Sequence, residues 1–262
     1  MISDASISPV AWSYMTFEAL ATDYDGTLAH DGVVEAPTIE ALNRARAAGL
    51  KLLMVTGREL NDLFSTFAHA ALFDAIVAEN GAVVYDPATQ DVDVLAEPPP
   101  QSLVERLRAQ GVPFSTGHSI VATVKPYEHQ LLEAIRDLEL EWHVIFNKSS
   151  VMALPSDVTK ASGLMPALRA LGVSSARTIG VGDAENDQAF LRACGVAVAV
   201  ANALQSVKDG AHLVTQGRDG AGIIELIDRI IAGELDVLLS RAHGDDRAVR
   251  HFKRAADPQA GV

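Results

Sequence analysis

The segment Leu20-Ala21-Thr22-Asp23-Tyr24-Asp25-Gly26-Thr27-Leu28 organises the rest of the chain. The apolar run at 17–21 predicts a strand, and this strand ends in two aspartates one residue apart. Because side chains alternate along an extended strand, Asp23 and Asp25 would leave it on the same side and share one site. Gly26 follows, where the backbone must turn sharply. The chemical interpretation is a nucleophile, a proton-transfer group and a metal site in one corner; the alternative is an Asx-rich turn that simply ends a strand.

Composition narrows the class of protein. The chain has 262 residues with 48% hydrophobic content, enough for a sizeable core. A formal net charge of -13 argues against nucleic-acid or anionic-membrane partners, and no apolar run approaches the roughly 20 residues of a membrane span. No Lys or Arg precedes Arg44, so the positive region of a secretory signal is missing. Cys194 is the single cysteine, which fits a core residue in a reducing, cytoplasmic location.

Alternating apolar runs and helical periods predict a doubly wound α/β domain with a parallel sheet. Uninterrupted apolar runs such as 50–55 are typical of parallel strands buried on both faces. The predicted strands cover 17–21, 50–55, 75–78, 82–85, 178–181, 196–200 and 212–214. The pattern changes at 86–155, where we expect a separate α+β insert. The predicted organisation is therefore a discontinuous core domain at 1–85 and 156–233, an insert at 86–155 and a charged tail at 234–262, with residues 1–15 as a loose leader.

Within the insert, helical periods near Leu103 and Leu131 alternate with strand candidates at 119–124, 142–146 and 151–154. Asn147-Lys148-Ser149 separates the last two and suits a hairpin turn.

Two further polar segments follow predicted strands. Thr56-Gly57-Arg58 offers a hydroxyl and an approachable amide for a phosphate oxygen; the alternative, favoured if this segment is taken alone, is that Thr56 is an ordinary cap of the next helix. Asp183 and Asp187 would lie on one face at a helix start, where acids also complement the helix dipole. Lys160 begins a helix, an electrostatically unfavourable place for a cation, so its ammonium is a candidate partner for a substrate anion. Ligands of open parallel sheets bind outside the carboxyl ends of the strands, so these segments are expected to meet there.

The order Asp-x-Asp-Gly-Thr, Thr-Gly-Arg, Lys and Gly-Asp-x-x-Asn-Asp resembles the four motifs of the haloacid dehalogenase-like (HAD) superfamily of phosphohydrolases. An insert between the second and third motifs, preceded by Glu79-Asn80-Gly81-Ala82, is similar to the Cof-type (subclass IIB) branch, in which the insert is a cap. The resemblance covers residues 20 to about 231 and implies a Rossmann-like core.

This resemblance implies a Mg²⁺-dependent phosphatase. Asp23 would attack phosphorus to form an aspartyl phosphate, and Asp25 would act as general acid and base. The implied phosphate-binding residues are Thr56, Gly57, Arg58, Lys160 and Asn186. The implied Mg²⁺ ligands are Asp23, Asp25 through its main-chain carbonyl, Asp183 and Asp187.

The cap is expected to select the leaving group of a small phosphorylated metabolite, such as phosphoglycolate or a sugar phosphate. The polar cap residues that we expect to matter are His118, Lys125, His143, Asn147 and Lys148. A phosphomutase or phosphotransferase on the same fold is the first alternative, and a non-catalytic binding protein is the second. The expected assembly is a monomer or a homodimer.

Overall fold

The structure, a computed structural model, describes residues 17–147 and 149–235. Its strands are β1 Ala19–Thr22, β2 Lys51–Val55, β3 Ala75–Ala78, β4 Val83–Tyr85, β5 Val92–Val94, β6 Phe114–Thr116, β7 Val121–Val124, β8 Trp142–Asn147, β9 Ser150–Pro155, β10 Thr178–Gly182, β11 Val196–Ala199 and β12 Leu213–Val214. Its α-helices are α1 Ala36–Ala47, α2 Leu60–Thr66, α3 Gln101–Ala109, α4 Glu128–Asp137, α5 Lys160–Ala170, α6 Gln188–Ala193, α7 Gln205–Gly210 and α8 Asp219–Ile231.

The larger sheet carries the core of the protein. Among the described residues it contains eight strands in the order β12-β11-β10-β1-β2-β3-β4-β5. The strands from β12 to β3 are parallel, whereas β4 and β5 extend the sheet antiparallel. All residues of β1, β3 and β11 are buried, as expected for parallel strands covered on both faces. β1 lies between β10 and β2, so the segments after these three strands emerge side by side at one edge.

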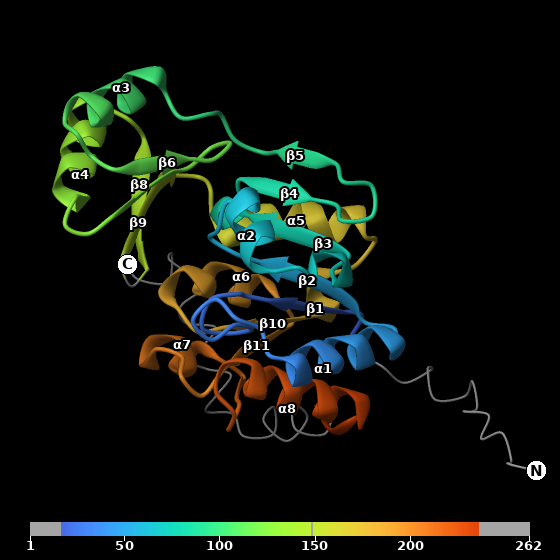
Figure 1. Cartoon of the computed structure of the whole chain (residues 1–262). Helices are drawn as coiled ribbons and strands as arrows, with labels where there is room; N and C mark the ends of the chain where they lie inside the picture. The colour runs from blue at the N-terminus through green and yellow to red at the C-terminus, as the bar shows by residue number, and fades with distance from the viewer. Residues whose placement is uncertain (1–16, 148, 236–262) are drawn as a thin grey trace, which may run out of the picture.

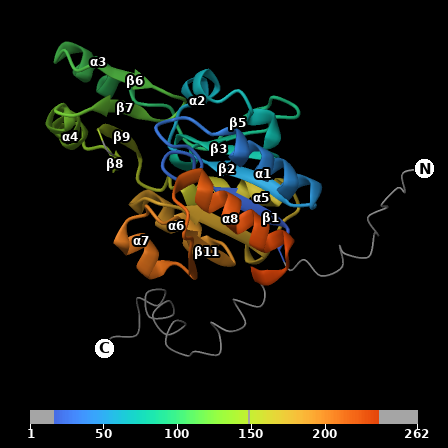
Figure 2. The same ribbon diagram turned by 60° about the horizontal axis from the view of Figure 1, so that its bottom comes forward.

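Helices cover both faces of this sheet. α1 and α8 pack together on one face, and α5 and α6 pack together on the other (Figures 1 and 2). α8 buries Ile223, Leu226, Ile227 and Ile230, which recur at the three- and four-residue spacing of one helical face. The doubly wound α/β core predicted from the sequence is therefore confirmed.

The second sheet belongs to a smaller lobe with a core of its own (Figure 1). Its strand order is β6-β7-β9-β8, and every pair is antiparallel. α3 and α4 contribute Leu103, Leu107, Leu131 and Ile135 to its buried cluster, together with Val121 and Val151 from the strands. β8 and β9 pair with Asn147 opposite Ser150, as the predicted hairpin requires.

Three details differ from the sequence predictions. β5 pairs with β4, so residues 92–94 extend the larger sheet although they fall inside the range 86–155 predicted for the insert. All three residues of β5 are exposed, so the sequence there lacks the continuous apolar run that identifies the buried strands. We therefore propose that the cap starts near residue 96. The short strand β6 was not predicted, and β7 begins at Val121 instead of residue 119.

Two predicted segments, the leader at 1–15 and nearly all of the charged tail, lie outside the described residues, as does Lys148. Within the part that is described, no helix combines the length and apolar character that crossing a membrane requires.

Candidate active site

The loop after β1 brings its two aspartates to the edge of the sheet. Asp23 is still paired with the sheet, because its N–H donates to the carbonyl of Val181 on β10 at 2.9 Å. Gly26 adopts φ +92°, and a Cβ there would lie 2.5 Å from a carboxylate oxygen of Asp183. Both the left-handed backbone and this close approach require glycine. Asp23 and Asp25 line the same cavity, which agrees with the predicted shared corner.

Lys160 lies between two of the predicted acids. Its Nζ is 2.5 Å from Asp23 Oδ1 and 2.6 Å from Asp187 Oδ1, and all three side chains are buried. The helix α5 begins at Lys160, and Thr159 caps it by accepting the N–H of Ser162. The side chain thus reaches the ends of β1 and β10, so the predicted convergence of Lys160 with the acidic loops is confirmed.

The acids form one cluster. Asp23, Asp183 and Asp187 each offer an oxygen within 4.8 Å of the others. The prediction that Asp183 and Asp187 share one face of a helix is wrong, because the chain from Glu185 to Asp187 forms a 3₁₀ turn. Asp187 Oδ2 instead accepts the N–H groups of Asp183 and Ala184, each at 2.9 Å. The Thr27 hydroxyl donates to Asp183 Oδ1 at 3.1 Å, which orients this third carboxylate.

The electrostatics of this cluster fit a divalent cation. Burial raises the pKa of Asp23 well above its ordinary value; Asp187 adds to the rise, Lys160 opposes it, and Asp183 also adds to it. Burial alone would lower the pKa of Lys160, but Asp187 and Asp23 outweigh it and raise this pKa. The Lys160 ammonium contacts two of the three carboxyl groups of this cluster, and hard cations such as Mg²⁺ prefer oxygen donors of this kind. The residues present fit the predicted metal.

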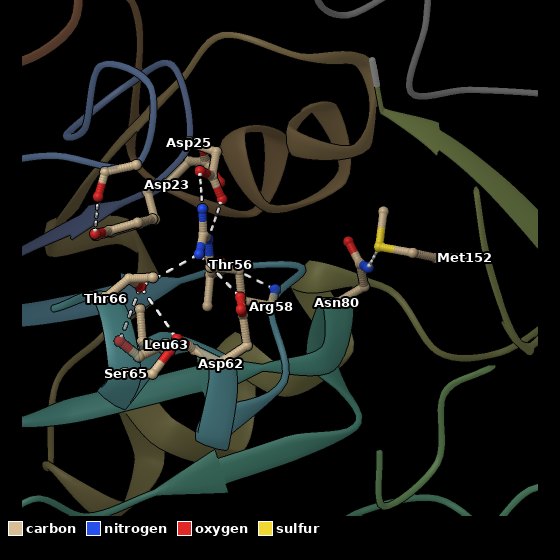
Figure 3. Close-up of polar contacts among 12 residues, drawn as sticks. Asp23, Asp25, Thr56, Arg58, Asp62, Leu63, Ser65, Thr66, Asn80 and Met152 are labelled. Atoms are coloured by element: carbon tan, nitrogen blue, oxygen red, sulfur yellow. Dashed lines mark hydrogen bonds and ion pairs between the residues drawn. The ribbon is translucent and has the colours of Figure 1, made fainter. Parts of the chain in front are cut away.

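Asp25 faces a different partner. Its carboxylate accepts two hydrogen bonds from the guanidinium of Arg58, at 2.7 Å from Nε and 2.8 Å from Nη2 (Figure 3). The Asp25 side chain is not part of the acidic cluster. The metal ligand predicted from Asp25 is its main-chain carbonyl, and this role stays a prediction. Arg58 also donates to Asp62 at 2.9 Å and lies over the Tyr24 ring, 5.1 Å from its centroid. Arg58, which was predicted to bind phosphate, thus donates to the carboxylates of Asp25 and Asp62 in this structure, and its phosphate-binding role stays a prediction.

Of the other predicted phosphate-binding residues, Gly57 lines the cavity, whereas Thr56 and Asn186 are not among the lining residues. Thr56 is buried and its Oγ1 accepts the N–H of Arg58 at 3.1 Å, an arrangement that leaves the hydroxyl proton to donate. The Asn186 amide donates to Asn80 Oδ1 at 3.0 Å. Asn80 belongs to the Glu79-Asn80-Gly81-Ala82 motif, from which the sequence predicts no role for it.

A cavity of about 540 Å³ lies between the acidic cluster and the smaller lobe. Of the predicted polar cap residues that the structure describes, Asn147 lines it, whereas His118, Lys125 and His143 do not. The lining residues that sequence reasoning missed are Glu59, Asp62, Ser115, Ile120, Ala122, Ser149, Ser150 and Met152. Ser149 belongs to the predicted hairpin turn and Ser150 follows it. The two-residue spacing of Ile120 and Ala122 is typical of one strand face, so these signals were present in the sequence.

Comparison with known proteins agrees with this geometry. The haloacid dehalogenase-like hydrolase family matches residues 20–115 and 119–227. A phosphoglycolate phosphatase of Methanothermobacter thermautotrophicus is 30% identical over 221 residues, covering 81% of this chain and 98% of the relative. Phosphoglycolate phosphatase 2 of Saccharolobus solfataricus is 29% identical over 219 residues, covering 82% of this chain and 92% of the relative.

Solved structures show the same fold. A haloacid dehalogenase-like hydrolase from Bacteroides thetaiotaomicron superposes with a TM-score of 0.72 at 19% identity, covering 82% of this chain and 99% of that one. A HAD subclass IIB sugar phosphatase superposes with a TM-score of 0.64 at 24% identity, covering 85% and 99%. Because the family match spans most of the chain and the relatives are phosphatases aligned over nearly their whole length, the chain belongs to the haloacid dehalogenase-like hydrolases and is a phosphatase of that family.

Proposed function

We propose that the protein hydrolyses phosphate monoesters of small metabolites with Mg²⁺, through an aspartyl phosphate on Asp23. The observation that carries this proposal is the Asp23 carboxylate at the cavity, 2.5 Å from Lys160 and within reach of Asp183 and Asp187. A nucleophile in this position attacks a phosphoryl group whose negative charge the surrounding cations offset. A cytoplasmic location, which the single cysteine favours, is part of the same proposal.

The proposed reaction has two steps. Asp23 attacks phosphorus while the bond to the ester oxygen breaks, and Asp25 gives its proton to the departing alcohol. A water molecule then attacks the aspartyl phosphate, Asp25 takes its proton, and inorganic phosphate leaves with the Asp23 carboxylate restored. Lys160 and Thr56 donate hydrogen bonds to the phosphoryl oxygens. Asp23, Asp183 and the carbonyl of Asp25, supported by Asp187, would hold Mg²⁺, which would supply positive charge against the phosphate dianion.

The position of the smaller lobe over the cavity favours a small substrate. Cap residues such as Ser115, Asn147 and Met152 line one wall of the cavity, and Asp23 and Lys160 line another. A leaving group of a few carbon atoms, as in phosphoglycolate or a sugar phosphate, suits a site enclosed in this way. The names of the relatives, phosphoglycolate phosphatase in two organisms, favour phosphoglycolate as the first ester to test.

Release of inorganic phosphate from a panel of metabolite monoesters, assayed with Mg²⁺ and again with EDTA, tests the proposal. We expect Mg²⁺-dependent hydrolysis of at least one small ester without any activating bisphosphate, which also distinguishes hydrolysis from a mutase reaction. The matched variant is Asp23→Asn, which keeps the size of the side chain and removes the nucleophile. Hydrolysis by this variant at the parent rate would overturn the covalent mechanism.

A further inference from the structure

The 3₁₀ turn Glu79–Gly81 lies between the core and the cap, and none of the roles above uses it. It is tied to the loop after β2: the N–H of Glu79 donates to the carbonyl of Arg58, and that of Asn80 to the carbonyl of Thr56, both at 3.0 Å. Glu79 and Asn80 have φ values of 50° and 54°, so two consecutive residues with side chains occupy the left-handed region. Such a backbone costs about 1 kcal/mol or more per residue and persists where surrounding contacts outweigh it.

The Glu79 side chain supplies contacts of this kind. It is fully buried, at 0% exposure, although it belongs to a residue type that is seldom buried without partners. Oε1 accepts the N–H of His118 at 2.9 Å, and Oε2 accepts the N–H of Ser119 at 2.9 Å. His118 Nδ1 lies 3.1 Å from Oε1. A carboxyl group of the core thus receives two main-chain amides of the cap, both at the turn between β6 and β7.

This turn leads directly into the cap wall of the cavity. Ser115 precedes it, and Ile120 and Ala122 follow it; all three line the cavity. Ser115 is itself tied to the core, since its hydroxyl donates to Glu59 Oε1 at 2.6 Å. Shifting the amides of His118 and Ser119 would therefore shift the side chains that face the leaving group.

The neighbouring side chain makes a second connection. The Asn80 amide lies 3.5 Å from the sulfur of Met152, another lining residue of the cap (Figure 3). The Asn80 oxygen accepts from Asn186, which belongs to the loop that carries Asp183 and Asp187. The same short turn therefore contacts the phosphate-binding loop, the acidic loop and the cap.

We propose that Glu79 is a positioning residue that fixes the β6–β7 turn of the cap against the core and thereby places Ser115, Ile120 and Ala122 over the reacting centre. The inference rests on the proposed phosphatase function and extends it. Glu79 touches neither the acidic cluster nor the cavity; it acts on the choice and alignment of the leaving group through the cap.

Glu79→Gln tests this role. The amide has nearly the shape of the carboxyl group, but its NH₂ would face an N–H of His118 or Ser119, and one cap contact would be lost. The quantity to measure is kcat/KM for p-nitrophenyl phosphate, phosphoglycolate and glucose 6-phosphate. For the faster of the two metabolite esters we expect a fall of about tenfold or more, because small misplacements of aligning groups have large effects on rate. For p-nitrophenyl phosphate, whose leaving group needs little alignment, we expect a change below about threefold.

A second variant approaches the contact from the cap and leaves the core sequence intact. A Cβ on Gly117 would lie 2.4–2.6 Å from the Glu79 carboxyl group, so Gly117→Ala forces the turn or the carboxyl group aside. We expect the same selective loss. The matched control is Gly210→Ala, where a Cβ meets no atom within 4 Å.

The outcomes separate the two proposals. Equal losses on all esters, in step with a lower melting temperature, would mean that Glu79 serves the stability of the fold alone and would overturn the inference. So would unchanged kinetics in both Glu79→Gln and Gly117→Ala. Failure of the proposed function is a different result: the parent protein would then release no inorganic phosphate from any of the three esters.

Discussion

The guanidinium of Arg58 donates two parallel hydrogen bonds to the carboxylate of Asp25, 2.7 Å from Nε to Oδ2 and 2.8 Å from Nη2 to Oδ1. Both side chains are about three-quarters buried, at 21% and 26% exposure, so solvent screens this pair less than a surface pair. The Asp25 contact raises the pKa of Arg58 further above its ordinary value, and an arginine guanidinium is charged at any working pH. Arg58 therefore sets the orientation of the carboxyl group that we propose as general acid and base.

Replacing Arg58 with lysine tests this relationship. A lysine ammonium cannot form the planar two-bond contact, so Asp25 loses its orientation. We expect kcat to fall by about 10- to 100-fold for alkyl phosphates, which need a proton on the leaving oxygen. The fall for p-nitrophenyl phosphate should be much smaller, because nitrophenolate leaves without that proton.

The measurement is kcat across a series of esters with different leaving groups. Arg44→Lys is the control, since Arg44 forms an exposed ion pair with Asp228 away from the cavity. Equal losses on every ester would instead favour the phosphate-binding role that the sequence predicted for Arg58.

Asp23→Asn should abolish turnover without weakening the metal-free fold. Loss of the nucleophile is expected to lower kcat by more than about a thousandfold. Because burial and the neighbouring acids raise the pKa of Asp23, its ionised form is unfavourable in the folded protein. A neutral amide removes that cost and still accepts a hydrogen bond from Lys160. Thermal denaturation in EDTA should give a melting temperature equal to or above that of the parent; a clear decrease would contradict the electrostatic account.

The stabilising effect of Mg²⁺ should grow with pH. Asp23 has a folded-state pKa above the unfolded value of 3.8, so without metal its ionisation weakens the fold as the pH rises from the unfolded pKa through the folded one. A divalent cation offsets this charge. We expect the rise in melting temperature on adding Mg²⁺ to be larger at about pH 8 than at about pH 5. A shift that is constant, or that declines with pH, would exclude Asp23 as a ligand whose proton the metal displaces.

Cys194 should resist thiol reagents in the native protein. Its side chain is buried, and burial raises the pKa of the thiol to about 12, so the reactive thiolate is scarce at neutral pH. A chromogenic disulfide reagent should label it on the time scale of unfolding and at once in denaturant. Rapid labelling of the folded protein would show that α6 opens locally, since Cys194 follows that helix directly.

Much of the core was predictable because its signals are local. Strands buried on both faces need continuous apolar residues, and Leu52 to Val55 meets that requirement without reference to any partner strand. Parallel strands place their carboxyl ends at one edge, so the convergence of Asp23, Thr56 and Asp183 followed from their order along the chain. The edge strand β5 was missed because its exposed residues carry no such pattern.

The sequence by itself thus determined the doubly wound core, the presence of an inserted lobe, and the acids and lysine that meet at the site. Tertiary structure alone decided that Arg58 pairs with Asp25, that Asn186 donates to Asn80, and that the buried carboxyl group of Glu79 accepts hydrogen bonds from the cap. The physical reason is the separation along the chain of the residues that interact. Apolar periods and turn residues are patterns of neighbours along the chain, whereas the hydrogen bond between the Ser119 N–H and the Glu79 carboxylate, 40 residues apart, exists only where the cap meets the core.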